Sequence, residues 1–255
     1  MHTSVLTTAV QQAHQAGRQA LIPFLPAGFP EPERFWELVQ ELDARGADII
    51  EIGVPFSDPV ADGPLIEAVS MECLACGVDL EWILAGLERI APKLSAPIVC
   101  MGYYNPFWQY GLQRFAHRAA QAGVAGCIVP DLPLEEAHPF QKELNVQGMD
   151  LIRMIGVNTS EKRMRQYAQN GSGFVYMVAA LGTTGSGSGF PPELPEALSR
   201  AQEIFEDPIA LGFGLERKEQ LGSLSELVDA VVFGSSLIRH IQGGGTVQAF
   251  LERWK

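Results

Sequence analysis

The chain has 255 residues, of which 47% are hydrophobic and 19% charged, and its net charge is −12. This size and composition are typical of a globular protein and predict a single domain spanning residues 1–255. The negative charge argues against a nucleic-acid partner, because an acidic surface repels a phosphate backbone. A small phosphorylated ligand stays possible, since backbone N–H groups can bind one locally.

The N-terminal segment lacks the basic and apolar regions of a signal peptide. No apolar run approaches the roughly 20 residues that a membrane helix requires. Four cysteines are too few for a disulfide framework at this length. We therefore expect a cytoplasmic protein without membrane contact.

Short apolar runs alternate with longer amphipathic runs along the whole chain. An extra helix is expected at the N-terminus, before the first apolar run. The runs that predict strands are Ala20–Leu25, Asp48–Gly53, Pro97–Tyr103, Gly126–Pro130, Asp150–Ile155, Phe174–Val178, Pro208–Phe213 and Ala230–Phe233. Most are continuously apolar, as parallel strands buried on both faces are. The helices predicted between and after them are Glu33–Arg45, Pro64–Cys76, Leu80–Leu94, Leu112–Ala122, Leu134–Asn145, Lys162–Gln169, Glu193–Phe205, Arg217–Leu224, a short one after Gly234, and Val247–Trp254.

Eight strand–helix units in this length predict an α/β fold, a single (β/α)8 TIM barrel. The alternative is a doubly wound open sheet, but no G-x-G-x-x-G motif opens a helix after the first strand. Two connections are long: Pro55–Gly63 after the second strand and Ala179–Pro192 after the sixth. In a barrel both lie over the C-terminal mouth, where active sites form, and glycine-rich loops there are candidate lids.

Acidic and phenolic groups dominate the predicted mouth. None of the five histidines or five lysines falls in a predicted strand, which disfavours a histidine-bound metal and a Schiff-base lysine. Cys73 and Cys76 form a C-x-x-C pattern within a predicted helix. We interpret them as small helix residues, with a redox role as the alternative.

Glu51 is the most informative residue, because a carboxylate within an apolar strand is costly to bury. One interpretation is a structural carboxylate with hydrogen-bonding partners. The other is a general acid and base, since an apolar setting favours the protonated form. Asp62, in the loop that follows, lies nearer water and more readily stays ionised. Two carboxyl groups in unlike environments suit a division of acid and base work.

A second signal concerns phosphate. Gly212–Gly214 ends the seventh predicted strand, and Gly234-Ser235-Ser236 ends the eighth and opens a short helix. Loops after strands seven and eight, with a short extra helix, are the recurrent phosphate site of TIM barrels. Two ordinary glycine turns are the alternative. The order and position of the two segments favour a phosphate-binding helix after strand eight.

The segment Glu51–Pro64 reads Glu-Ile-Gly-Val-Pro-Phe-Ser-Asp-Pro-Val-Ala-Asp-Gly-Pro and closely resembles a signature of the tryptophan synthase α chain family. Four further segments resemble the family in the same order: Tyr103–Pro106, Pro130–Pro133, Gly212–Gly214 and Gly234-Ser235. The resemblance covers nearly the whole chain. It implies retro-aldol cleavage of indole-3-glycerol phosphate to indole and glyceraldehyde 3-phosphate, a carbon–carbon lyase reaction in the last steps of L-tryptophan biosynthesis.

The resemblance also implies roles for individual residues. Glu51 corresponds to the acid and base, Asp62 to the carboxylate beside the indole nitrogen, and Tyr176 to a tyrosine near the substrate. The remaining substrate-binding residues that it implies are Phe24, Tyr103, Cys127, Thr184, Gly185, Gly214, Gly234 and Ser235. No metal or cofactor is implied in this chain. A separate β chain, expected in an α2β2 heterotetramer, carries pyridoxal phosphate, and Asp58, Asn105 and Pro106 fall in regions that face it.

One departure concerns the loop after the sixth strand, where Ala180 stands at the place of an arginine in the family's pattern. The departure keeps two alternatives open: a catalytically weak α-like chain that acts as an allosteric activator of a β chain, and a stand-alone lyase that releases indole. A different phosphate-binding barrel, such as an isomerase or epimerase, is a third alternative.

Overall fold

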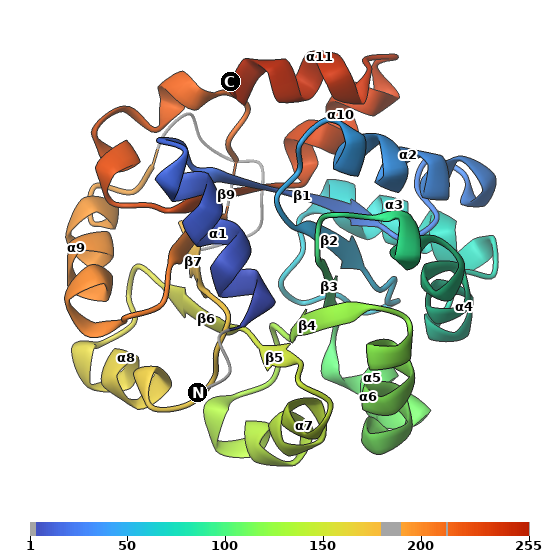
Figure 1. Cartoon of the computed structure of the whole chain (residues 1–255), viewed down its shortest axis with the longest axis horizontal. Helices are drawn as coiled ribbons and strands as arrows, with labels where there is room; N and C mark the ends of the chain where they lie inside the picture. Colours follow the sequence, from blue (N-terminus) through green and yellow to red (C-terminus); the bar gives the residue numbers. More distant parts are fainter. Residues whose placement is uncertain (1–3, 180–189, 213, 255) are drawn as a thin grey trace.

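The computed structural model describes residues 4–179, 190–212 and 214–254. Its strands form one parallel sheet that curls into a barrel, with helices around the outside (Figure 1). The strands of the described residues are β1 (Ala20–Pro26), β2 (Ile50–Gly53), β3 (Ile98–Met101), β4 (Val124–Ile128), β5 (Asp150–Leu151), β6 (Arg153–Gly156), β7 (Val175–Val178), β8 (Ile209–Gly212) and β9 (Ala230–Phe233). The fold predicted from the alternating runs is therefore confirmed.

The barrel closes through one interrupted strand. The sheet order is β5-β4-β3-β2-β1-β9-β8-β7-β6. β5 pairs with β4 and β6 pairs with β7, and the single residue Ile152 separates the two short strands. Asp150–Ile155, expected as one strand, thus serves as two half-strands that join the two ends of the sheet.

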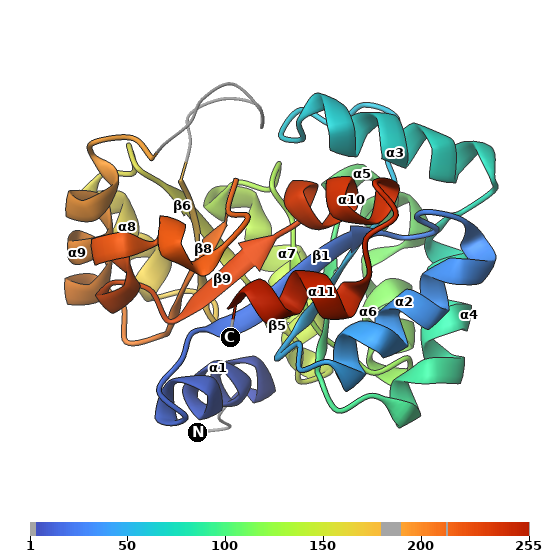
Figure 2. The ribbon, with the colours of Figure 1, turned by 90° about the horizontal axis from the view of Figure 1, so that it is seen from above.

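Most helices surround the sheet, whereas α1 lies across one end of the barrel (Figures 1 and 2). Their bounds are α1 (Val5–Gln15), α2 (Pro32–Ala44), α3 (Pro64–Ala75), α4 (Leu80–Ile90), α5 (Tyr104–Tyr110), α6 (Leu112–Gln121), α7 (Leu134–Val146), α8 (Glu161–Ala168), α9 (Leu194–Ile204), α10 (Ser235–Gln242) and α11 (Val247–Leu251). Proline at the first helical position begins α2 and α3, where a missing N–H costs nothing. Figure 2 places α1 and α3 at opposite ends of the barrel.

Alternate residues of the strands face two separate apolar layers, as the period of two requires. Ile22, Val99 and Val232 belong to a cluster inside the barrel. Leu25 and Cys100 belong to the larger cluster between the sheet and the helices. Strands that are apolar on both faces explain the continuous apolar runs in the sequence.

The helix α1 covers the N-terminal end of the barrel. Leu6 and Val10 are fully buried and pack with the inner cluster. The Ser4 side chain caps α1 by accepting from the N–H groups of Leu6 and Thr7, and its hydroxyl donates to Asp150. The Thr7 hydroxyl donates to the carbonyl oxygen of Gly173 at 2.6 Å. Apolar packing and hydrogen bonds together therefore hold α1 against this end of the barrel.

Besides the interrupted strand, the helix predicted over Leu80–Leu94 ends at Ile90, and two further segments differ from their predictions. Arg217–Leu224, expected as one helix, forms two 3-10 turns, Lys218–Gln220 and Gly222–Glu226. Gly222, the first residue of the second turn, has a φ of +48°, which a continuous helix does not allow. The third strand ends at Met101, two residues earlier than expected, and α5 begins at Tyr104. The segment Tyr103–Pro106 therefore turns from the sheet into a helix.

The cysteine pair Cys73 and Cys76 lies at the C-terminal end of α3. Both thiols are free; the first is buried and the second exposed. Burial raises the pKa of Cys73 to about 12, which keeps this thiol protonated and unreactive at neutral pH. Among the described residues no helix is long and apolar enough to cross a membrane.

Candidate active site

Glu51 lies in the middle of β2, inside the C-terminal half of the barrel. Its neighbours across the sheet are Phe24 of β1 and Val99 of β3. The side chain is fully buried, and neither carboxylate oxygen has a hydrogen-bonding partner among the described residues. Burial, and then the nearby charge of Asp62, raise its pKa to about 8. Glu51 is therefore protonated at neutral pH. Its two oxygens are free to hydrogen-bond a ligand and to exchange the proton with it.

Asp62 lies in the connection between β2 and α3 and is partly exposed. Burial raises its pKa, and a hydrogen bond from the Tyr103 hydroxyl opposes that rise. The same hydroxyl accepts from the backbone N–H of Ala61 at 2.9 Å. The Tyr103 ring stacks on Phe56 with 5.2 Å between the ring centroids. Tyr103 thus holds this connection, and the carboxylate on it, at the barrel mouth.

Tyr176 reaches the same space from β7. Burial raises the pKa of its phenol well above the usual value, and the nearby carboxyl groups of Glu51 and Asp62 act in the same direction. The phenol stays protonated and can donate a hydrogen bond. Gly212 of β8 makes room for it, because a Cβ there would lie 2.3 Å from the phenol oxygen.

A cavity of about 130 Å³ joins these groups at the C-terminal mouth. The cavity is polar on one side, with Glu51, Asp62 and Tyr176 together. Its apolar lining comprises Phe24, Ile66, Met101, Met154, Val178 and Val232. Of these, the sequence-based site included only Phe24. For the four strand residues the signal was their inward position on β3, β6, β7 and β9, since alternation places every second residue inside the barrel. Ile66 belongs to α3, and strand alternation gives no signal for it.

The glycine-rich end of the cavity lies at the start of α10. Gly214, Gly234, Ser235 and Ser236 all line it. Gly214 has a φ of +64° and open space around its Cα, so the backbone is accessible there. A Cβ on Gly234 would lie 2.7 Å from the ring of Phe24. The first N–H groups of a helix lack partners within the helix and attract anions, which makes this end suited to phosphate.

Cys127 does not lie in this cavity, contrary to the prediction. Its side chain is fully buried in the outer cluster, between the sheet and the helices. Ile128, the next residue of β4, faces the inner cluster instead. The alternation along β4 thus points Cys127 away from the mouth, and we remove it from the site. Tyr103 does not line the cavity either and acts on it through Asp62. Thr184, Gly185 and Ala180 lie outside the described residues.

The residues expected to face a partner surround the mouth. Asp58 and Asn105 are exposed, and Pro106 is half-buried. Two large apolar side chains accompany them: Val60 is 78% exposed and Trp108 59% exposed. The hydrogen bond from Ala61 to Tyr103 joins the two segments that carry these residues. Of these two, Val60 directly precedes Ala61, which lines the cavity.

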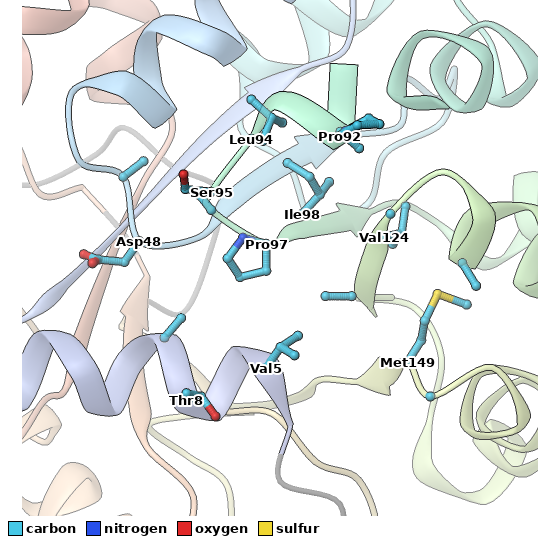
Figure 3. A pocket seen from close by; sticks show the side chains of 18 of the residues that line it. Val5, Thr8, Asp48, Pro92, Leu94, Ser95, Pro97, Ile98, Val124 and Met149 are labelled. Atoms are coloured by element: carbon cyan, nitrogen blue, oxygen red, sulfur yellow. The ribbon is translucent and has the colours of Figure 1, made fainter. Parts of the chain in front are cut away.

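A second hollow, of about 820 Å³, lies at the opposite end of the barrel. Figure 3 shows Val5 and Thr8 of α1 below it, Pro97 and Ile98 above it, and Met149 on the right. Among the described residues that line it, Asp48 alone is ionisable, and it is paired with Arg18 at 2.6 Å. The hollow contains none of the candidate catalytic groups, and the N-terminal face of a TIM barrel serves stability.

The carboxylates, the phenol and the glycine-lined helix start meet at the C-terminal mouth of a parallel barrel, the arrangement of a TIM-barrel enzyme. The family model described as tryptophan synthase alpha chain matches residues 10–251. The chain is 54% identical to the tryptophan synthase alpha chain of Solidesulfovibrio magneticus over 255 residues, which is 100% of both chains. It is 42% identical to that of Methanosarcina mazei over 91% of this chain and 85% of the relative.

Solved structures agree with the sequences. A structure of Mycobacterium tuberculosis tryptophan synthase superimposes with a TM-score of 0.91 at 30% identity, over 99% of this chain and 97% of that one. The tryptophan synthase subunit alpha of Legionella pneumophila gives 0.86 at 29% identity, over 98% and 94%. The chain therefore belongs to the tryptophan synthase alpha chain family. It is a lyase that catalyses the α reaction of tryptophan biosynthesis, the cleavage of indole-3-glycerol phosphate.

Proposed function

We propose that Glu51 transfers both protons of this cleavage and that Asp62 stabilises the charge that develops between the two transfers. The observation that carries the proposal is the state of Glu51: a fully buried carboxyl group without a partner among the described residues, in a cavity shared with a second carboxyl group. A structural carboxylate is expected to have its hydrogen bonds satisfied. An unsatisfied one with a raised pKa at a barrel mouth suits acid–base work.

The first step is protonation of the indole ring. Protonated Glu51 gives its proton to the ring carbon that carries the glycerol chain, and the ring nitrogen takes up positive charge. Asp62, as a carboxylate, accepts a hydrogen bond from that N–H and stabilises the cation. A carboxylate at the cavity edge is well placed for this, because it stays nearer to water than Glu51 does.

The second step breaks the carbon–carbon bond. The Glu51 carboxylate takes the proton from the glycerol hydroxyl next to the ring, and an aldehyde forms on that carbon. The electron pair of the broken bond returns to the ring and neutralises the nitrogen, which yields indole and glyceraldehyde 3-phosphate. Glu51 ends protonated, as it began. Tyr176, protonated and beside Glu51, donates a hydrogen bond that orients the hydroxyl. The proposal asks for no cofactor or metal in this chain.

The phosphate group is assigned to the N-terminal end of α10. Ser235 begins this helix directly after Gly234, and Gly214 leaves the neighbouring backbone open, since nothing lies within 4 Å of a Cβ built there. The Ser236 hydroxyl donates to the carbonyl oxygen of Leu215 at 2.7 Å, which ties the loop after β8 to the helix. Two glycine segments that are held together in this way form one anion site. Thr184 and Gly185 remain proposed contacts from the loop after β7.

A β chain carrying pyridoxal phosphate is the proposed partner, in an α2β2 heterotetramer. Its contact region is the exposed surface around the mouth, with Asp58, Asn105 and Pro106 beside the apolar side chains of Val60 and Trp108. Exposed apolar groups with a polar rim suit a protein interface. A cytoplasmic location accompanies the proposal, because all four cysteines are free and thiols persist in reducing compartments.

Indole release from indole-3-glycerol phosphate tests the proposal, measured with the purified chain alone and with its cognate β chain. Slow release alone and a large gain with the partner indicate a coupled α subunit. Fast release alone indicates a stand-alone lyase. No release in either case, with the β reaction still accelerated, indicates an activator that has lost its own chemistry.

Asp62→Asn is the sharper test of the division of work. The substitution keeps the shape and removes the charge, so we expect a loss of about 10²–10³-fold in kcat, as when one oxyanion-type stabiliser is removed. Asp58→Asn is the matched control, since this exposed carboxylate of the same connection lies outside the cavity. Near wild-type turnover of Asp62→Asn would contradict the role assigned here.

A further inference from the structure

The apolar end of the catalytic cavity is small for the ring that it must hold. The whole cavity has a volume of about 130 Å³. An engineered apolar cavity of about 150 Å³ in another protein accepts benzene, a single ring. Indole has two fused rings and its glycerol phosphate needs further room. A movable part of the described apolar wall would therefore enlarge the room for the second ring.

Most of this wall is fixed. Val178 and Val232 are β-branched and stiff. The Phe24 ring lies against Gly53 and Gly234, so closely that a Cβ on either glycine would come within 2.7 Å of it. Met101 and Met154 are the unbranched, flexible members of the lining. Methionine has three rotatable side-chain bonds and a polarisable sulfur that contacts aromatic rings favourably.

Met154 alone, among the described lining residues, also borders a second cavity. This cavity has a volume of about 410 Å³ and lies between α7 and α8, with Ala137, Gln141 and Tyr167 in its wall. Met101 has no such space beside it in the described cavities. The catalytic cavity and the space between the two helices are thus separated at Met154.

Strand pairing is incomplete at Met154. Pairing between β4 and β5 ends with Cys127 and Leu151. Beyond Ile152, β6 continues with Met154 but is paired only with β7. A backbone held by one ladder instead of two yields more readily to a displaced side chain.

We infer that Met154 is the specificity-determining residue of the aromatic end of the site, a movable partition that yields toward the space between α7 and α8. The inference rests on the proposed function and extends its substrate class to indole-3-glycerol phosphates that carry a substituent on the six-membered ring. A small group on the ring edge that faces Met154 displaces this side chain, while the rest of the wall stays in place.

The test compares kcat/KM for the parent substrate and for four analogues, each methylated at one carbon of the six-membered ring. For the wild-type chain we expect at least one analogue within about threefold of the parent. Met154→Ile keeps the side chain apolar and similar in size but makes it stiff. In Met154→Ile, kcat/KM for that analogue divided by kcat/KM for the parent substrate is expected to fall at least tenfold. In Met154→Leu the same ratio is expected to fall by an intermediate factor.

Met177→Ile is the matched control, because Met177 is a fully buried methionine of β7 that faces the outer cluster and lines neither cavity. It is expected to keep the wild-type ratio. Calorimetric binding of indole and the four methylindoles gives a second readout that needs no turnover. Equal ratios in the wild type and Met154→Ile, in both measurements, would overturn the inference. A wild-type chain that binds methylindoles selectively but cleaves nothing would instead overturn the proposed function.

Discussion

The carboxylates at the N-terminal end of the barrel differ from Glu51 at its mouth in their hydrogen bonding. At the N-terminal end, Asp43, Asp48, Asp150 and Asp229 each accept hydrogen bonds from backbone N–H groups or side chains. At the C-terminal mouth, Glu51 is more deeply buried than any of them and has no such partner among the described residues.

The difference separates stability from catalysis within one fold. A carboxylate with several hydrogen-bond donors lowers the free energy of the folded state and has less capacity left for a ligand. An unsatisfied one destabilises the folded state and keeps its whole capacity for the substrate. The following substitutions at both ends test whether this division holds.

The largest effect is expected for Glu51→Gln, which keeps the size of the side chain and removes its proton chemistry. We expect kcat to fall by about 10²–10⁴-fold, the contribution of one positioned acid and base. Circular dichroism and urea unfolding check that the fold is kept. Near wild-type cleavage of indole-3-glycerol phosphate by this variant would mean that another group moves the protons.

The pH dependence of stability gives the next effect. The pKa of Glu51 rises from 4.5 to about 8 on folding. Between these two values the folded state holds a proton that the unfolded chain releases, so the free energy of unfolding falls as the pH rises, by up to about 1.4 kcal/mol per pH unit. Urea unfolding from about pH 5 to about pH 8 should show this slope in the wild type and a smaller one in Glu51→Gln. Identical slopes would show that the carboxyl group titrates normally.

At the opposite end, Asp150→Ala should act on stability alone. Ser4 and Ser172 both donate to this carboxylate, and their loss is expected to lower the free energy of unfolding by about 1.5–3 kcal/mol. Urea unfolding measures the loss, and kcat/KM should stay within about twofold of the wild type. A large loss of turnover with unchanged stability would break the comparison between the two ends.

Gly234→Ala should give the smallest effect. The added Cβ would lie 2.7 Å from the Phe24 ring, at the mouth end where phosphate is assigned. We expect KM to rise about tenfold, equivalent to about 1.4 kcal/mol of binding, with a smaller change in kcat. Gly243→Ala, at the other end of α10, is the control, since its nearest contact is a backbone oxygen at 3.3 Å. Equal KM values for the two variants would move the phosphate site elsewhere.

The sequence predicted the barrel well because its strands are apolar on both faces and its helices on one. Glu51 and Gly234 could be proposed as site residues from the sequence because each is unusual in its local pattern, and both line the cavity. Cys127 was misplaced because a one-residue step along a strand reverses the direction of a side chain. The break of the fifth strand at Ile152 and the role of Tyr103 depend on contacts between distant segments, which local pattern does not contain.

The closing contacts of α1 have a consequence for how the chain assembles during synthesis. Ser4 bonds to a residue 146 positions later and Thr7 to one 166 positions later. The helix α1 is therefore without these polar partners until Asp150 and Gly173 have been translated. Contacts of such long sequence separation slow folding and leave apolar surface uncovered in the meantime. The nascent barrel thus stays open at its base while most of its strands are already made.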